Sequence, residues 1–85
     1  MRVKTIYMEH TDTTIMEYNG RTLTLAGEYD GGEAWIDGKH WGWERDTAAG
    51  TVVFMDDEDI MVFEDTDAGW DGFVKGLFPI REVAA

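Results

Sequence analysis

The chain has 85 residues, of which 44% are hydrophobic and 13% aromatic, so it can form one packed core and is not intrinsically disordered. It contains no cysteine, which excludes disulfides and thiolate metal sites and favours a cytoplasmic location. Its formal charge of −11 disfavours direct binding to nucleic acid or to an anionic membrane. We therefore predict a single acidic domain over residues 1–85.

The first half of the chain is predicted to form β-strands. A β-prone strand is expected over residues 2–8. Residues 13–18 and 21–25 alternate in polarity around Asn19-Gly20, the pair most typical of a type I′ hairpin turn. The face of this hairpin that we expect to be buried carries Met16, Tyr18, Leu23 and Leu25.

Two further hairpins are predicted downstream. They join residues 33–36 to 39–44 and residues 51–55 to 60–64. The pair Asp37-Gly38 forms the first turn, and four consecutive acidic residues form the second. Alternation in the first of these hairpins places Trp35 beside His40, on one face. The opposite face, expected to be buried, carries Ala34, Ile36, Trp41 and Trp43.

The segment 67–78 is open between a short helix and a bent pair of strands. Its apolar residues recur at helical spacing, with Asp67 as a candidate N-cap. These residues, expected to be buried in either case, are Trp70, Phe73, Val74, Leu77 and Phe78. Against the helix stand three glycines, each unfavourable by about 1 kcal/mol relative to alanine. The predicted fold class is therefore all-β or mostly β: a small antiparallel sheet or barrel of hairpins, with the C-terminal helix left open.

The strand-pair alternative is accompanied by a family resemblance. The run from Asp59 to Val83, with Asp67-Ala68-Gly69-Trp70 and Gly76-Leu77-Phe78-Pro79 within it, resembles the later part of an SH3 domain. The resemblance implies a small barrel in which Trp70 and Pro79 occupy positions of the proline-peptide groove. The second groove tryptophan of that family is replaced by Asp71 and the groove tyrosine by Glu82. The resemblance thus implies the barrel more than the peptide binding.

Carboxylates are the candidate binding groups, and many of them lie in the second half of the chain. Clustered oxygen ligands suit Ca²⁺, and the spacing from Asp65 onward is similar to a calcium loop, but Gly76 stands where an EF-hand has its bidentate glutamate. His10 and His40 are a weak metal pair, and we expect solvated acidic turns without metal or cofactor. The predicted partner-binding carboxylates are Asp56, Asp57, Glu58, Asp59, Glu64, Asp65, Asp67 and Asp71.

Binding is a more plausible function than catalysis. The chain has no serine or cysteine nucleophile and little room for a substrate cleft, so we expect no enzyme. Trp35 is a candidate aromatic hot spot because alternation separates it from Trp41 and Trp43. Alternatives that stay open are an acidic domain of a halophile, a tryptophan-based peptide or sugar module, a virion assembly subunit and a homodimer.

The leading hypothesis is an inhibitor that binds a basic protein surface, for example that of a nucleic-acid-binding protein. Duplex DNA carries one negative charge per roughly 1.7 Å of axis. Carboxylates two residues apart on a strand lie on one face at about 6.6 Å, so neighbouring strands can offer a comparable lattice of anions. In size and composition the chain resembles phage DNA mimics and anti-CRISPR proteins. This resemblance implies a DNA-mimic decoy.

Overall fold

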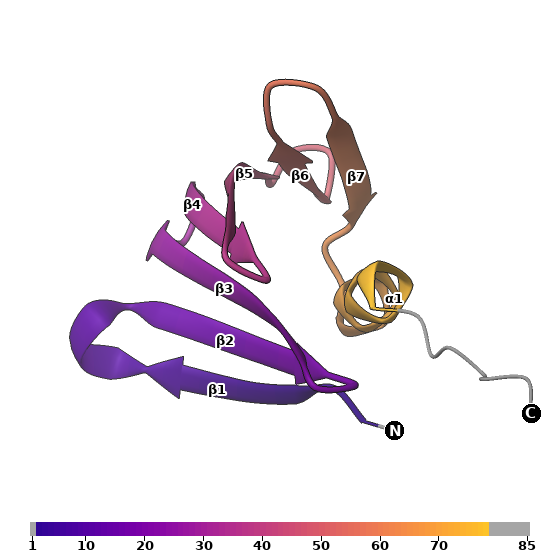
Figure 1. Ribbon diagram of the computed structural model, residues 1–85. Coiled ribbons are helices and arrows are strands. Elements are labelled where there is room, and N and C mark those ends of the chain that lie inside the picture. The colour runs from indigo at the N-terminus through magenta and orange to yellow at the C-terminus, as the bar shows by residue number, and fades with distance from the viewer. Residues whose placement is uncertain (1, 79–85) are drawn as a thin grey trace, which may run out of the picture.

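The computed structural model describes residues 2–78, which form a mostly β domain with one α-helix (Figure 1). The strands are β1 (Lys4–Met8), β2 (Thr13–Tyr18), β3 (Arg21–Glu28), β4 (Gly31–Ile36), β5 (Lys39–Asp46), β6 (Thr51–Met55) and β7 (Ile60–Glu64). A 3-10 turn, η1 (Glu9–Thr11), follows β1, and the helix α1 (Asp67–Leu77) follows β7. The predicted first strand thus begins at Lys4 rather than at Arg2.

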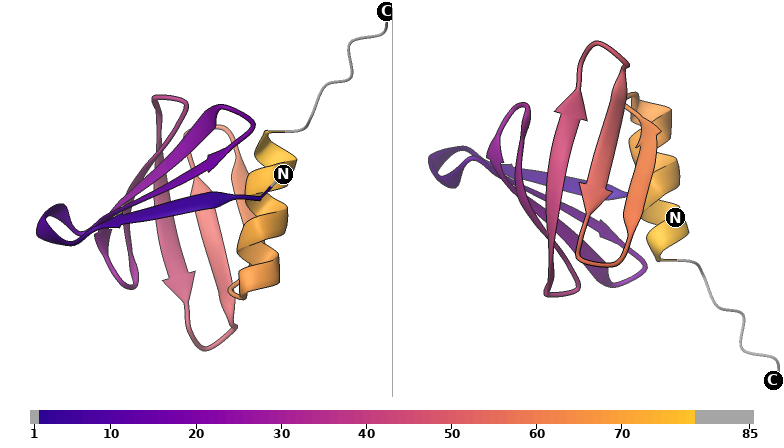
Figure 2. Two further views of the ribbon diagram at one scale, coloured as in Figure 1. Left: turned by 90° about the horizontal axis from the view of Figure 1, so that it is seen from below. Right: turned by 90° about the horizontal axis from the view of Figure 1, so that it is seen from above.

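All seven strands belong to one antiparallel sheet in which each strand pairs with its neighbours in sequence. The sheet curves strongly, and α1 lies on its concave side, between the two ends of the arc (Figures 1 and 2). The helix contacts β7 at one end of the arc and β2 near the other. The prediction of a mostly β fold built from hairpins is confirmed, and its helical element is α1.

The Asn19-Gly20 turn has the geometry that its sequence predicts. Asn19 and Gly20 have φ angles of 59° and 77°, as a type I′ turn requires. Tyr18 pairs with Arg21 and Met16 pairs with Leu23, which is the predicted register. The register predicted for the second hairpin, with Trp35 beside His40, is also confirmed, and the third hairpin joins the two predicted strands.

We expect Gly20→Val to lower the free energy of unfolding by more than about 1 kcal/mol, because a β-branched residue tolerates positive φ poorly. The space around Gly20 is empty, so the penalty is conformational rather than steric. Gly20→Asn is the matched control, because asparagine accepts this conformation better. Equal denaturation midpoints for the valine variant and the parent would contradict the assigned turn.

The core fills the space between the concave face of the sheet and the helix. Its fully or nearly fully buried members are Tyr18, Leu23, Leu25, Ala34, Trp41, Trp43, Val52, Phe54, Val74 and Phe78. Met16 and Ile36, also predicted for this face, are partly buried and pack against the core. An aromatic cluster connects the helix to the sheet: the rings of Phe63 and Phe73 stack with centroids 4.1 Å apart, and the Trp70 ring meets Phe63 edge-on at 4.8 Å.

The segment after β7 is a helix, so the alternative of a bent strand pair is wrong. Thr66 rather than Asp67 is the N-cap, because its hydroxyl accepts a 3.0 Å hydrogen bond from the Gly69 N–H. The helix contributes only Val74 and parts of a few large side chains to the core, yet these meet three aromatic rings of the sheet, those of Trp43, Phe54 and Phe63. Tertiary packing of this stripe outweighs the low helix propensity of the glycines.

The SH3-like arrangement does not occur, because Trp70 lies on α1 and not on a strand. Its indole N–H donates a 3.0 Å hydrogen bond to Asp65, and its ring belongs to the aromatic cluster. Pro79 and Glu82, the other residues named in that resemblance, lie outside the described residues. The helix in this structure is eleven residues long and lacks the length and apolar character to cross a membrane.

Candidate partner interface

The convex face of the sheet carries apolar side chains that α1 does not cover. Residues that alternate with the core positions on β6 and β7 point to this face, and the register aligns Val53 with Val62 and Met55 with Ile60. Ile60 and Val62 are 71% and 60% exposed. We call Val53, Met55, Ile60 and Val62 the apolar strip. Contiguous exposed apolar side chains are typical of interaction surfaces.

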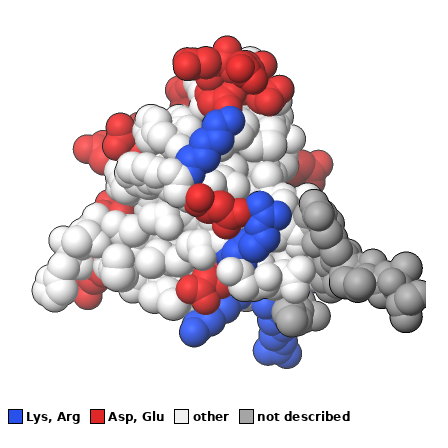
Figure 3. Space-filling model, viewed as in Figure 1, with Lys and Arg blue, Asp and Glu red and all other residues white. Residues whose placement is uncertain are grey.

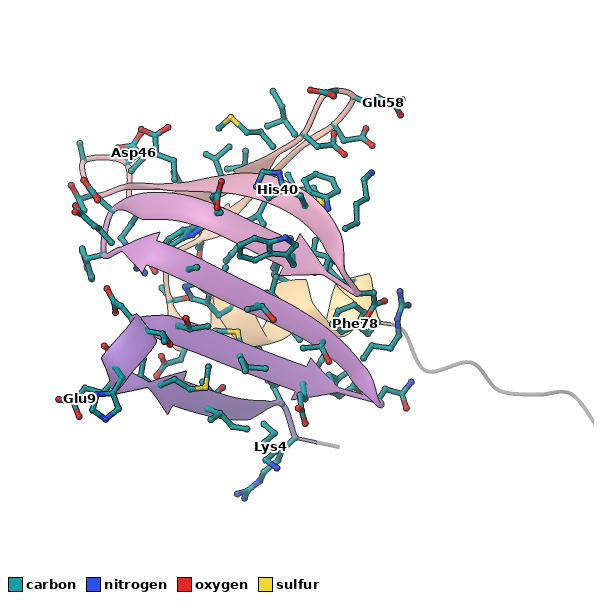
Figure 4. All side chains as sticks on the ribbon, turned by 60° about the vertical axis from the view of Figure 1, so that its left-hand side comes forward. Lys4, Glu9, His40, Asp46, Glu58 and Phe78 are labelled. Carbon is teal, nitrogen blue, oxygen red and sulfur yellow. The ribbon has the colours of Figure 1, made fainter. Side chains whose placement is uncertain are left out.

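Trp35 lies on the same convex face, as predicted. It pairs with Thr24 on one side and with His40 on the other, and its ring centroid is 5.6 Å from that of His40. Figure 4 looks onto this face, with His40 near its middle. Trp35 is partly exposed on this face and does not belong to the core.

The turn between β6 and β7, which we call the acidic tip (Asp56–Asp59), is held in shape by its first residue. The Asp56 carboxylate accepts hydrogen bonds of 2.8 and 2.7 Å from the Glu58 and Asp59 N–H groups. It also forms a 2.8 Å ion pair with Lys39. Asp56 is therefore a structural residue, and the turn displays Asp57, Glu58 and Asp59. Within residues 2–78 no ion pair involves these three side chains.

Figure 3 shows these carboxylates gathered over the β6–β7 turn. Four basic side chains each lie in an ion pair with an aspartate, and only that of Lys39 involves a residue of the tip, Asp56. Most of the few basic side chains are thus paired with aspartates of the same chain, and the tip keeps a strong negative charge.

The Asp56 interactions predict a pH dependence of stability. The Lys39 hydrogen bond, followed by those of the Glu58 and Asp59 N–H groups, lowers the pKa of Asp56 from 3.8 to about 2. A lowered carboxyl pKa adds stability that is complete above the ordinary value and is lost as pH falls toward the folded value. We expect the stability advantage of the parent over Asp56→Asn to shrink between pH 4 and pH 2 in acid unfolding followed by circular dichroism. A constant difference would contradict this role.

The structure separates the other predicted carboxylates. Glu64 lies at the far end of β7, on the convex face and exposed. Asp65 is turned inward, where hydrogen bonds from Trp70 and then Arg45 lower its pKa. Asp67 and Asp71 line a hollow against β1 and β2, and Asp71 pairs with Lys75 at 2.9 Å. Asp65 and Asp71 are thus structural partners of basic or aromatic side chains.

Two acidic residues that the sequence did not single out flank the apolar strip. Glu44 pairs with Val53 across β5 and β6, and Glu33 pairs with Gly42 beside it. Both are exposed, and Glu33 lies 3.5 Å from His40. Alternation on β5 could have placed Glu44 on the face opposite Trp43. The pairing of β5 with β6, which brings it to the apolar strip, follows from the meander and not from local pattern.

A cleft of about 460 Å³ lies between β5 and the acidic tip. Pairing of β5 with β6 begins at Gly42 and Met55, so residues 39–41 continue past the end of β6. The lining of the cleft includes three carboxylates of the tip and one basic side chain: Asp56, Asp57, Glu58 and Lys39, together with His40 and Trp41. The chemistry suits a cationic side chain rather than an anion. Among the described residues no three carboxylate or imidazole groups are placed to hold a metal ion, and the calcium-like spacing falls mostly on α1.

Searches against protein-family models, curated protein sequences and solved structures found no match to this chain.

Proposed function

We propose that this protein is a non-enzymatic inhibitor that binds a basic, nucleic-acid-binding surface of a partner protein. The observation that carries the proposal is the acidic tip: three carboxylates that have no ion pair within residues 2–78, displayed by a turn that Asp56 fixes from within. Adjacent to it lies the apolar strip with Trp35. An apolar centre with a charged surround is the usual anatomy of a protein interface.

The charge distribution favours a basic protein as the partner. Attraction between a fixed negative turn and a cationic groove accelerates encounter and selects partners by sign. Glu33, Glu44 and Glu64 extend the negative charge along the same face as the strip. In this arrangement the carboxylates take the place of phosphates, and the apolar strip and Trp35 supply contacts that nucleic acid lacks.

The proposal is tested by capture and competition. The immobilised protein is exposed to a lysate of its source cells, and bound proteins are eluted with a salt gradient and identified. We expect a nucleic-acid-binding protein that duplex DNA displaces at low salt. A column of Asp57→Asn/Glu58→Gln/Asp59→Asn, which keeps Asp56, should retain much less of it.

The matched control is Glu9→Gln/Glu28→Gln/Asp30→Asn, which removes the same charge from turns at the opposite end of the sheet. Equal loss on both columns would show that only net charge matters. Capture of proteins that DNA does not displace would contradict the decoy role.

A further inference from the structure

The sheet has two edge strands, β1 and β7, and they differ in how they resist pairing with another chain. β1 carries Lys4 and ends in the η1 turn, both of which discourage an additional strand. β7 has no lysine or proline and pairs residue for residue with β6, without a bulge. Its convex side chains Ile60 and Val62 are also the more exposed, at 71% and 60% against 37% for Ile6. Within residues 2–78, β7 is the less protected edge over Ile60 to Val62, whereas the Glu64 carbonyl already accepts a 2.9 Å hydrogen bond from the Thr66 N–H.

The helix runs alongside β7 in both views of Figure 2, so its outer flank decides whether a strand has room there. Phe73 stacks on Phe63 of β7 and marks the side of α1 that meets this strand. Gly69 and Gly76 lie four residues before and three after Phe73, and are therefore its neighbours on the helix surface. Gly72 adjoins both. The flank beside β7 is a glycine stripe (Gly69, Gly72 and Gly76).

Two of these glycines have no role inside the fold. A Cβ added at Gly72 or Gly76 would meet no atom of residues 2–78 within 4 Å, and both glycines are exposed. Each nevertheless weakens the helix by about 1 kcal/mol relative to alanine. Without side chains at these positions, the flank leaves room for a segment to pass close over the helix.

We propose that β7 accepts an extended, positively charged segment of a partner protein as an eighth strand. Its backbone pairs with β7 at Ile60 and Val62, alternate side chains extend the convex face beside these two residues, and the others face the glycine stripe. The acidic tip at one end of β7 and Glu64 at the other set the positive charge of its flanks. Only the positive charge of the partner segment rests on the proposed function. The strand pairing rests on the exposed edge of β7.

The test uses the blocked peptide Lys-Lys-Val-Thr-Val-Thr-Val-Lys-Lys with two analogues, one N-methylated at the valines and one at the threonines. An extended strand presents alternate N–H groups to opposite edges. We expect the parent peptide to bind at low salt and to protect β7 amides, not β1 amides, from hydrogen exchange. One analogue should bind about as well as the parent peptide and the other at least about tenfold more weakly. Equal binding or equal loss for the two analogues, absence of binding, or protection of β1 would overturn the proposal.

Variants of the protein separate this site from the acidic tip. Gly72→Gln/Gly76→Gln should lower the affinity for the peptide by about tenfold without lowering the unfolding midpoint of the protein. Ile60→Ser/Val62→Ser should also lower this affinity. Ile6→Ser/Met8→Ser on β1 is the matched control and should leave binding unchanged. Unchanged binding to the glutamine variant would also overturn the proposal. If neutralising Asp57–Asp59 leaves the association rate unchanged while the two analogues still differ, the role of the tip fails and the strand site stands.

Discussion

Replacing Trp70 with alanine will lower the free energy of unfolding by about 3–5 kcal/mol, the usual range for a large aromatic in a core. The ring meets Phe63 at 4.8 Å, Phe54 at 6.1 Å and Trp43 at 6.4 Å between centroids. Its N–H also donates to Asp65, which the truncation would leave with Arg45 alone. Denaturant unfolding followed by circular dichroism measures the loss.

Trp35→Ala is the matched control for this prediction. Trp35 lies on the convex face, outside the core, so its truncation should cost less than half as much stability. It should instead weaken partner binding, because exposed tryptophans are often interface hot spots. If Trp70→Ala were as stable as the parent and only partner binding were lost, Trp70 would belong to the interface and the assigned core would be wrong.

The glycines of α1 should respond to alanine in opposite directions. At Gly69 an added Cβ would clash with the Glu64 carbonyl oxygen, so the chain entering the helix would have to move. We expect Gly69→Ala to lower stability by about 1–3 kcal/mol, as overpacking does. Thermal unfolding measures this loss.

Gly72→Ala is the control at the same helix. The Cβ meets open space there, so the alanine should raise stability by about 0.5–1 kcal/mol through helix propensity. Destabilisation of similar size at both positions would mean that the assigned packing of α1 against β7 is incorrect.

The hairpins were predictable because their signals are local. Asn19-Gly20 and Asp37-Gly38 take positive φ angles, and the alternation around them sets which side chains face the core. The alternation of Trp35 with Trp41 and Trp43 therefore predicted its face correctly. The helix was harder, because its three glycines oppose its apolar spacing, and only contacts such as Phe73 with Phe63, distant in sequence, decide between them.

The candidate interface was predictable only in part. The acidic run from Asp56 to Asp59 is visible in the sequence, but the role of Asp56 depends on Lys39, a partner from another strand. In the sequence alone, Asp65 and Asp67 cannot be distinguished from the acidic residues of the tip. The fold directs Asp65 toward Arg45 and Trp70 and places Asp67 toward β1 and β2, away from the tip. Exposure of Val62 follows from the place of β7 at the edge of the sheet that residues 2–78 form, and no local pattern encodes that place.

The central claim, that the acidic tip attracts a basic partner, is tested most directly by the association rate of the captured partner at increasing salt. Exposed charges are screened over about 8 Å at physiological ionic strength, so the attraction should fade as salt rises. For Asp57→Asn/Glu58→Gln/Asp59→Asn we predict a rate about tenfold lower at low salt, and a much flatter salt dependence. The equally charged Glu9→Gln/Glu28→Gln/Asp30→Asn should keep a rate close to that of the parent. Equal rates and equal salt dependence for the tip variant and the parent would contradict the claim, and the acidity would then serve solvation instead of binding.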